Sequence, residues 1–379
     1  MDNKVYYGEY SLKHWIDLIL KENIVLPDYQ RHFVWNEEDV LELIKTLKDK
    51  QFVPHVIIGA FNIDKKPQNL ILDGQQRLTS ILLARLNLCP DRDKYNKPIT
   101  RTANENDDEE DDEQPDIIEW TFKTYIDENK NKQKGYYNEL DLKDIDDDFF
   151  ENTFLGFAYL VPANNSDKTA QQKYYSTVFR NINKKGEKLL PQESRKSLYF
   201  LDSDLVQFFD PDFCKTLTIN KTKLDFVRYL SLLSQYYKEK RADNVAKYYG
   251  RKMEEYYEEY IYSIVGENDS KMFGDFSGIF PGKKYDTRFE LLDQAIKSLT
   301  ANQFLSIIDS DMYLFGLIYE IIFEKKTIDD TKKDSLKQEL DKKINTYKDD
   351  YSHRKTPSAL KHLRSRIDES IAIYKRYAK

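Results

Sequence analysis

Apolar residues recur with two different periods along the first half of the chain. A helix is predicted for residues 36–50, because its apolar side chains are spaced to share one face: Val40, Leu43, Ile44 and Leu47. Asn36 precedes this run as a candidate N-cap, with Asp39 three residues later. The almost wholly apolar stretches HVIIGAF, residues 55–61, and NLILD, residues 69–73, have the length of buried strands.

Helical and strand-like segments continue to alternate up to about residue 163. RLTSILLARLNL, residues 77–88, has helical length and places Leu78, Ile81, Leu82 and Leu86 on one side. IEWTFKTYI, residues 118–126, and FLGFAYLVPA, residues 154–163, are strand-like. The pattern therefore favours a domain that mixes helices and strands.

From about residue 220 the spacing becomes helical almost throughout. Three segments carry this pattern: residues 223–240, 295–308 and 312–326. We predict an α+β domain over residues 1–215, with an acidic insertion at about 102–116, followed by a mostly α-helical domain over residues 216–379.

Composition places the chain among cytoplasmic proteins. It has 379 residues, 33% of them charged, and a mean hydropathy of −0.74. No apolar run approaches the ~18–20 residues that span a bilayer, and the first residues lack the apolar core of a signal peptide. Cys89 and Cys214 cannot build a disulfide scaffold. We expect no membrane association.

Charge is unevenly distributed. Residues 105–116 contain nine acids and no base, and without them the formal net charge would change from −7 to +2. Such a run is predicted to be a solvated loop, with DNA mimicry or partner binding as the alternative. Residues 353–379 have eight Lys or Arg against two acids. They could engage DNA phosphates through Lys361, Arg364 and Arg366, or form a solvated helix face.

Tyrosine is abundant in the second half of the chain. Eight examples lie within 27 positions: Tyr236, Tyr237, Tyr248, Tyr249, Tyr256, Tyr257, Tyr260 and Tyr262. Aromatic residues interleaved with lysine can stack on unpaired bases. We favour the other interpretation, in which they fill helix–helix interfaces.

The pentapeptide Asp73-Gly74-Gln75-Gln76-Arg77 links a predicted strand to a predicted helix. A helix N-terminus offers free N–H groups and the positive end of its dipole. Arg77 adds donors suited to phosphate, Asp73 could hold a hydrated Mg²⁺ or orient an arginine, and either glutamine could position a water. A purely structural role is the alternative: Asp73 caps the helix and Arg77 forms a surface ion pair.

Two further polar stretches could complete a nucleotide site. IVLPDYQRHFVW, residues 24–35, contains Gln30 and Arg31 beside the aromatic Tyr29, so that a base could stack while arginine meets phosphate. VFRNINKKGEKLLPQESRKSL, residues 178–198, contains Arg180 and Asn183 ahead of a helix that should begin at Pro191.

In this order, LPDYQRHFVW, LILDGQQRLTSILL and FRNINKKGEKLLPQESR resemble the N-terminal domain of GmrSD-type restriction enzymes, over roughly residues 8–205. The same family occurs in phosphorothioate-sensing Ssp defence effectors. The resemblance implies a compact fold like those of ParB and sulfiredoxin. It also implies binding or hydrolysis of nucleoside triphosphates, and control of the cleavage of modified phage DNA.

Carried onto this sequence, the resemblance assigns three sets of residues. The phosphate and its Mg²⁺ would be held by Asp73, Gly74, Gln75, Gln76 and Arg77, with Asp73 as metal ligand. The same cleft would be lined by Tyr29, Gln30 and Arg31. Arg180 and Asn183 would close it.

The chain departs from the restriction enzymes in its second half. An HNH nuclease domain needs a histidine base and His, Asn or Asp metal ligands. Only five histidines are present, and we expect His353 and His362 to be surface residues. Three hypotheses remain: a regulatory nucleoside triphosphatase of an anti-phage restriction system with a separate nuclease, a non-catalytic DNA-binding module, and a nuclease that acts through the Asp73–Arg77 cleft.

Overall fold

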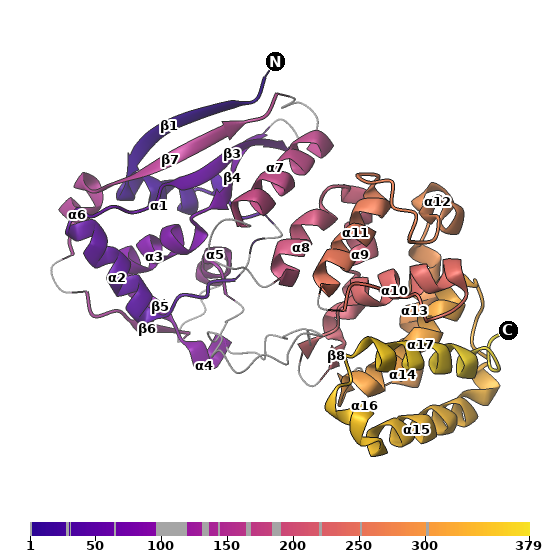
Figure 1. The fold of residues 1–379 in the computed structure, drawn as a ribbon. Coiled ribbons are helices and arrows are strands. Elements are labelled where there is room, and N and C mark those ends of the chain that lie inside the picture. The colour runs from indigo at the N-terminus through magenta and orange to yellow at the C-terminus, as the bar shows by residue number, and fades with distance from the viewer. Residues whose placement is uncertain are drawn as a thin grey trace. The chain divides into compact units, whose positions relative to one another are not determined.

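The computed structural model describes twelve stretches of the chain. They are residues 2–27, 30, 32–63, 66–95, 120–130, 136–142, 145–163, 168–183, 191–219, 222–250, 252–300 and 303–379. The described residues up to Leu201 form one compact unit, and Asp202–Lys379 form a second (Figure 1). The first unit mixes strands and helices and the second is mostly helical, which confirms the predicted fold class. The acidic run at 105–116 lies outside the described residues.

A five-stranded sheet organises the first unit. Its strands are β1 (Lys4–Ser11), β2 (Ile24–Val25), β3 (Val56–Ile63), β4 (Lys66–Asp73) and β7 (Phe154–Val161). The spatial order is β1-β7-β3-β4-β2. β1 and β7 are antiparallel, as are β3 and β4, whereas β3 runs parallel to β7 and β2 runs parallel to β4. The sheet is therefore mixed, and the predicted strands at 55–61, 69–73 and 154–163 are confirmed.

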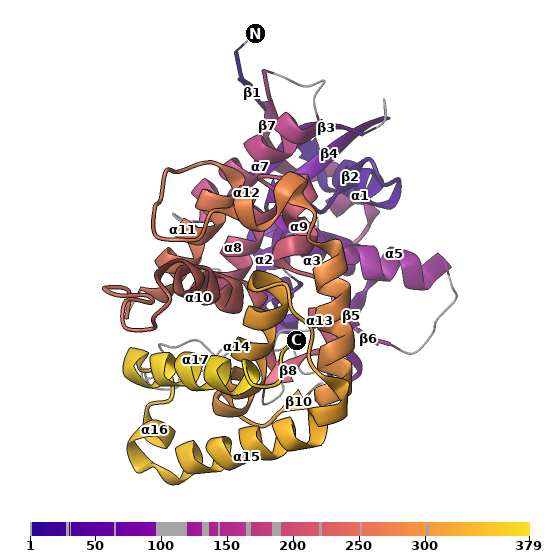
Figure 2. The same ribbon diagram turned by 90° about the vertical axis from the view of Figure 1, so that its right-hand side faces the viewer.

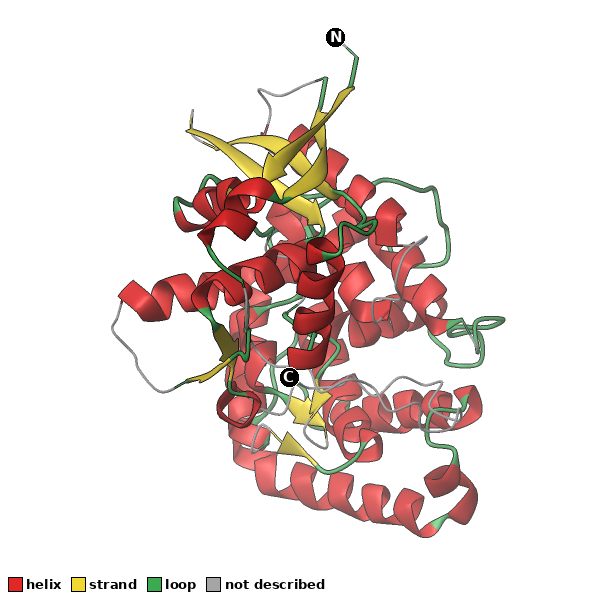
Figure 3. Cartoon of the chain, turned by 90° about the vertical axis from the view of Figure 1, so that its left-hand side faces the viewer, coloured by secondary structure: helices red, strands yellow, loops and turns green. Residues whose placement is uncertain are grey.

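Helices cover both faces of this sheet (Figure 3). On one face α1 (Leu12–Leu20), α2 (Glu37–Lys48) and α3 (Gln75–Leu86) bury the apolar core that includes Ile58 and Ile71. On the other face α7 (Lys168–Asn183) packs over Phe61 and Leu72. Alternate residues of each strand therefore enter opposite cores, which explains why β3 and β4 are nearly continuously apolar.

The contact of α7 with the sheet depends on Gly59. The Tyr175 hydroxyl donates to the carbonyl oxygens of Ala60 at 2.5 Å and Leu160 at 3.1 Å, so its ring packs closely against β3. A side-chain Cβ at Gly59 would overlap that ring. Glycine is thus required here by a close approach, because both side chains cannot occupy the same space.

Smaller elements complete the first unit. They are β5 (Leu88–Pro90), α4 (Arg92–Tyr95), α5 (Phe122–Lys130), β6 (Tyr137–Glu139), α6 (Asp147–Asn152) and α8 (Pro191–Tyr199). The helix expected to begin at Pro191 is confirmed, and so is the Asn36–Asp39 capping of α2, which forms a complete capping box.

The strand prediction for residues 118–126 is wrong, because that stretch leads into α5. Thr121 and Thr124 each accept a hydrogen bond from the other's backbone N–H, which starts a helix in the manner of an N-cap. Phe122 and Ile126, four residues apart, then enter the main core together. The four-residue spacing of these two apolar side chains suits a helix. Burying both of them in the core outweighs the β propensity of the aromatic residues.

The second unit is a set of packed helices with one small sheet. Its longer helices are α10 (Phe226–Glu239), α11 (Met253–Val265), α13 (Asp286–Leu299), α14 (Ile307–Ile318), α15 (Lys333–Asp349) and α17 (Leu360–Tyr374). Short helices are α9 (Val206–Phe209), α12 (Phe276–Ile279) and α16 (Tyr351–Lys355), and the strands are β8 (Thr218–Ile219), β9 (Thr222–Lys223) and β10 (Gln303–Phe304). Among the described residues, no helix combines the length and apolarity needed to cross a membrane.

Two predictions for this unit have different outcomes. Residues 295–308 do not form one helix: α13 ends at Leu299, β10 pairs with β8, and α14 begins at Ile307. The tyrosines mostly fill interfaces, as favoured, and Tyr256, Tyr257 and Tyr260 are buried.

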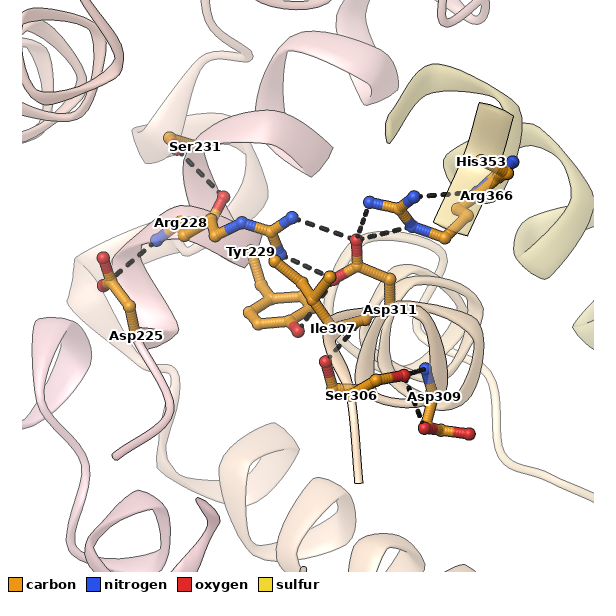
Figure 4. A network of polar contacts seen from close by, with 11 residues as sticks. Asp225, Arg228, Tyr229, Ser231, Ser306, Ile307, Asp309, Asp311, His353 and Arg366 are labelled. Carbon is orange, nitrogen blue, oxygen red and sulfur yellow. Dashed lines mark hydrogen bonds and ion pairs between the residues drawn. The ribbon is translucent and has the colours of Figure 1, made fainter. Parts of the chain in front are cut away.

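A buried charge network joins three helices of this unit (Figure 4). The Asp311 carboxylate on α14 accepts two bonds from Arg228 on α10, at 2.6 and 2.9 Å. It also accepts from the Arg366 Nε on α17 at 2.9 Å and from the Tyr229 hydroxyl at 2.9 Å. Burial alone would raise the pKa of Asp311, but the two guanidinium groups outweigh it and hold that pKa below its ordinary value.

The expectation that His353 and His362 are surface residues is wrong. Both are buried, and their rings lie 4.3 Å apart, with His353 also stacked on Tyr347 at 4.1 Å. His353 Nε2 lies 2.9 Å from the Arg366 NH1 group, which has only donors, so this nitrogen accepts and the ring is neutral. Burial, assisted by the charge of Arg366, lowers the pKa of His353 to about 4.

We predict that Asp311→Asn destabilises the protein by about 3–5 kcal/mol, because two buried guanidinium groups lose the carboxylate that they share. The free energy of unfolding in urea measures this. Asp269→Asn, at an exposed loop position, is the control and should change stability by less than about 0.5 kcal/mol. A loss in Asp311→Asn as small as in the control would contradict the network's role.

His353 makes stability depend on pH. In the unfolded chain it titrates near its ordinary pKa of 6.5, whereas in the folded protein its pKa is about 4. Between those values the unfolded state binds the extra proton, so folding stability should fall as pH drops from about 6.5 to about 4. His353→Gln should flatten this part of the stability curve, while His14→Gln, at an exposed position of α1, should leave it unchanged.

Candidate functional site

The turn between β4 and α3 has the geometry of an anion-binding helix start. Asp73 ends β4, Gly74 has φ +92°, and the first turn of α3 follows at once with no side-chain cap on its N-terminal N–H groups. A Cβ at Gly74 would also lie 3.3 Å from Val56 Cα and 3.0 Å from Arg77 NH2. Glycine therefore meets two demands, a left-handed backbone and a close approach. The predicted helix start at Gln75 is confirmed.

Just before the turn, β4 contains a bulge. Ile58 pairs with Ile71 and Ile57 pairs with Asp73, so Leu72 is an extra residue opposite β3. Bulges redirect the side chains that follow them and recur beside active sites. Here the bulge immediately precedes Asp73 and fixes the direction in which that carboxylate leaves the sheet.

Asp73 and Arg77 pair with each other. Arg77 NH2 lies 2.8 Å from the Asp73 carboxylate and 3.4 Å from the His55 carbonyl oxygen. The Arg77 side chain is only 14% exposed, whereas that of Asp73 is 41% exposed. The Arg77 Nε is buried and has no hydrogen-bond partner. The pair is the one expected from the structural alternative, except that Arg77 is largely buried and Asp73 does not cap the helix.

Gln76 has a structural role. The sequence analysis did not distinguish it from Gln75, since it allowed either glutamine to position a water. Its amide oxygen accepts from the Val34 N–H at 3.0 Å, and its amide nitrogen donates to the His32 carbonyl oxygen at 3.0 Å. Gln76 is buried, so its amide holds the backbone that leads into α2. Gln75 is buried beside it in the first turn of α3.

Gln30 makes the reciprocal contact from the IVLPDYQRHFVW stretch. Its amide nitrogen donates to the carbonyl oxygens of Ile71 at 2.9 Å and Leu72 at 3.3 Å, the two residues at the bulge. β2 pairs with β4 only up to Leu70, so Gln30 continues the pairing by a side chain where the strand ends. The two glutamine motifs are thus bound to each other's backbone.

The third motif begins in the last part of α7, which packs on β3 and β4. α7 crosses the sheet so that Val178 and Ile182 pack with the Leu72 core, and Arg180 lies half-buried in this last part of the helix. Asn183 is its final residue, and its side chain is not described. Tyr29 and Arg31 lie outside the described residues, so their predicted roles remain predictions.

Three hydroxyl groups near the motifs escaped the sequence analysis. Thr79 and Ser80 follow Gln76 by three and four residues on α3, and Ser176 lies on α7. All three are fully buried, and their oxygens have no hydrogen-bond partner. The sequence signal for Thr79 and Ser80 is that they are polar residues one turn beyond Gln76, in an otherwise apolar part of the helix. Unpaired buried hydroxyls call for a specific cause such as a bound ligand or water.

Asp73 suits a metal ion that arrives with its substrate. Among the described residues no three His, Cys, Asp or Glu side chains gather into a ligand cluster. Mg²⁺, however, commonly uses one or two carboxylates, several waters and the phosphates themselves. A single, partly exposed carboxylate beside an anion-binding helix start fits that type of site.

The three residues predicted to bind DNA lie in different environments. Arg366 is fully buried and bonded to Asp311, so its assignment as a DNA contact is wrong. Arg364 is half-buried and donates through Nε and NH2 to the Val245 carbonyl oxygen at 2.9 and 2.8 Å, so part of its guanidinium is engaged within the protein. Lys361 is exposed.

A protein-family model matches the sheet-containing unit. The model of the GmrSD restriction endonuclease N-terminal domain matches residues 12–200, the region that carries all three motifs. An uncharacterized protein of Methanocaldococcus jannaschii is 34% identical over 99 residues, which cover 20% of this chain and 17% of that protein. No solved structure matches, and the expected likeness to ParB and sulfiredoxin stays a prediction. Through residues 12–200 the chain belongs to the family of the GmrSD restriction endonuclease N-terminal domain.

Proposed function

We propose that this protein binds a nucleoside triphosphate with Mg²⁺ at the Asp73–Arg77 turn and hydrolyses it, and so regulates an anti-phage restriction system whose nuclease is a separate chain. One observation carries the proposal: an uncapped helix start behind a left-handed glycine, with a largely buried arginine one turn in. The free N–H groups and the helix dipole favour an anion there.

The Asp73–Arg77 pair offers a way to accept a charged ligand. Arg77 holds Asp73 through one NH2 group, and its Nε is free to donate. When a triphosphate enters, the guanidinium can turn to the phosphate oxygens while the carboxylate turns to the metal. Mg²⁺ would supply charge neutralisation on the phosphate oxygens. Each partner of the ion pair thus gains a partner of opposite charge.

Gln75 is our candidate for positioning water because it occupies the first position of α3, beside the N-terminal N–H groups. Gln76 is bonded on both sides of its amide to residues 32–35, which gives it a structural role. Glutamine can orient a water for attack on a terminal phosphate, as it does in GTP hydrolysis. We therefore assign the catalytic role to Gln75 and a positioning role to Gln76.

The central test is phosphate release from ATP, GTP, CTP and UTP with Mg²⁺, with and without DNA. Arg77→Gln should lower turnover about 100-fold or more, because a charged donor to the transferring phosphate is lost. Arg85→Gln is the matched control: it lies on the same helix, pairs with Asp147 at the far end, and should keep wild-type turnover. Folded wild-type protein that neither binds nor hydrolyses any of the four nucleotides would refute the proposal.

Substitutions of Gln75 and Gln76 should have different effects in the same assay. Gln75→Leu should abolish turnover. Gln76→Leu should lower the unfolding midpoint as well as turnover, since it leaves the His32 carbonyl and the Val34 N–H without their partner. Wild-type turnover in Gln75→Leu, or an unchanged unfolding midpoint in Gln76→Leu, would contradict this division of roles. Nicking of plasmid DNA that is lost in Asp73→Asn would instead favour the nuclease alternative.

A further inference from the structure

The second unit exposes tyrosine at two places, and both lie near the start of α17. Tyr248 is 88% exposed and Tyr351 is 66% exposed, whereas most other described tyrosines of the unit are buried or half-buried. Lys247 stands 5.4 Å from the Tyr248 ring centre, and Lys355 stands 5.8 Å from that of Tyr351. Large aromatic side chains turned to solvent beside lysine are unusual in a unit that buries its aromatics.

Contacts on α17 bring the two tyrosines to one region. The loop that carries Tyr248 touches the first turn of α17, where Leu360 lies 3.6 Å from the position of a Cβ on Gly250. Lys361, the next residue, reaches the Ser352 hydroxyl on α16 at 3.3 Å, and Tyr351 precedes that serine. α16 also lies beside the starting end of α17 in both Figure 1 and Figure 2.

The loop holds Tyr248 outward in a strained conformation. Tyr248 has φ +76° and Ala246 has φ +50°, values that residues with side chains rarely adopt. Gln235 fixes the loop by accepting from the Ala246 N–H at 2.9 Å, and Arg364 fixes it by donating to the Val245 carbonyl. Such strain persists only where surrounding contacts enforce it, and it concentrates at functional sites.

Four exposed cations lie around the two rings: Lys247, Arg354, Lys355 and Lys361. No ion pair is found for them among the described residues. Acids lie nearby as well: Asp349 and Asp350 directly precede Tyr351, with Asp350 capping α16, and Asp243 lies near Arg364. The unpaired cations beside the rings are the groups that can meet phosphates.

We propose that Lys247, Tyr248, Tyr351, Arg354, Lys355 and Lys361, here called the Tyr248 surface, bind unpaired nucleotides of single-stranded DNA. Bases stack on the exposed tyrosine rings, and the cations meet the phosphates between them. A duplex keeps its bases stacked on each other, so it offers the rings nothing to stack on. Arg364 acts as a positioning residue that holds the loop. Every residue in this surface belongs to the second unit, and none of them is part of the nucleotide site.

The test measures fluorescence anisotropy of a labelled oligo-dT of about 20 nucleotides, and of a duplex of equal length, with the full-length protein over a range of salt concentrations. The wild type should bind the single strand more tightly than the duplex. Lys247→Gln and Lys361→Gln should each reduce the slope of log affinity against log salt by about 0.7. Lys342→Gln, at an exposed position of α15, should leave the slope of log affinity against log salt unchanged.

Tyr248→Asn separates binding from folding. Asparagine tolerates positive φ, so the unfolding midpoint should stay equal or rise, while affinity for oligo-dT falls roughly tenfold. Tyr248→Phe should retain the affinity. Tyr7→Asn, which removes an exposed tyrosine of β1 in the other unit, should bind as the wild type does. Tighter binding of the duplex, unchanged affinity in Tyr248→Asn, or no binding at low ionic strength would each overturn the proposal.

Discussion

The candidate site depends on one backbone constraint, the left-handed conformation of Gly74. At φ +92° this residue turns the chain directly from the last residue of β4 into the first turn of α3. The turn leaves little room for a Cβ, and it places the uncapped helix N-terminus beside Asp73 and Arg77. Any longer connection would separate the strand's final carboxylate from the helix dipole, so the charge arrangement follows from the shortness of this turn.

Two amide side chains then make the turn rigid. Gln30 binds the carbonyl groups at the β4 bulge, and Gln76 binds the backbone of residues 32–34. Each stretch therefore supplies the hydrogen bonds that the other lacks, and neither is complete alone. Because a buried amide without partners is costly, this exchange links the geometry of the two stretches. It leaves Asp73 and Arg77 as the charged groups of the turn that can respond to a ligand.

In the second unit, charge is used in two opposite ways. Arg228 and Arg366 are buried on Asp311 and tie α10, α14 and α17 together, a role that removes them from solvent. Around the start of α17, by contrast, lysines and Tyr248 are held in solvent by a strained loop. Basic residues close in sequence thus serve packing in one case and an exposed surface in the other. Arg364 connects the two, since it lies between them and holds the loop.

The sequence by itself determined the order of domains, the strands around Ile58 and Ile71, and the start of α3. These features follow from local periods, capping residues and glycine, which act over a few positions. Only the tertiary structure decided that Gln76 holds residues 32–34, that Arg366 and His353 are buried, and that residues 122–126 form a helix. Each of these depends on a partner distant in sequence or on the core it faces. A polar side chain looks the same in sequence whether water or another segment satisfies its hydrogen bonds.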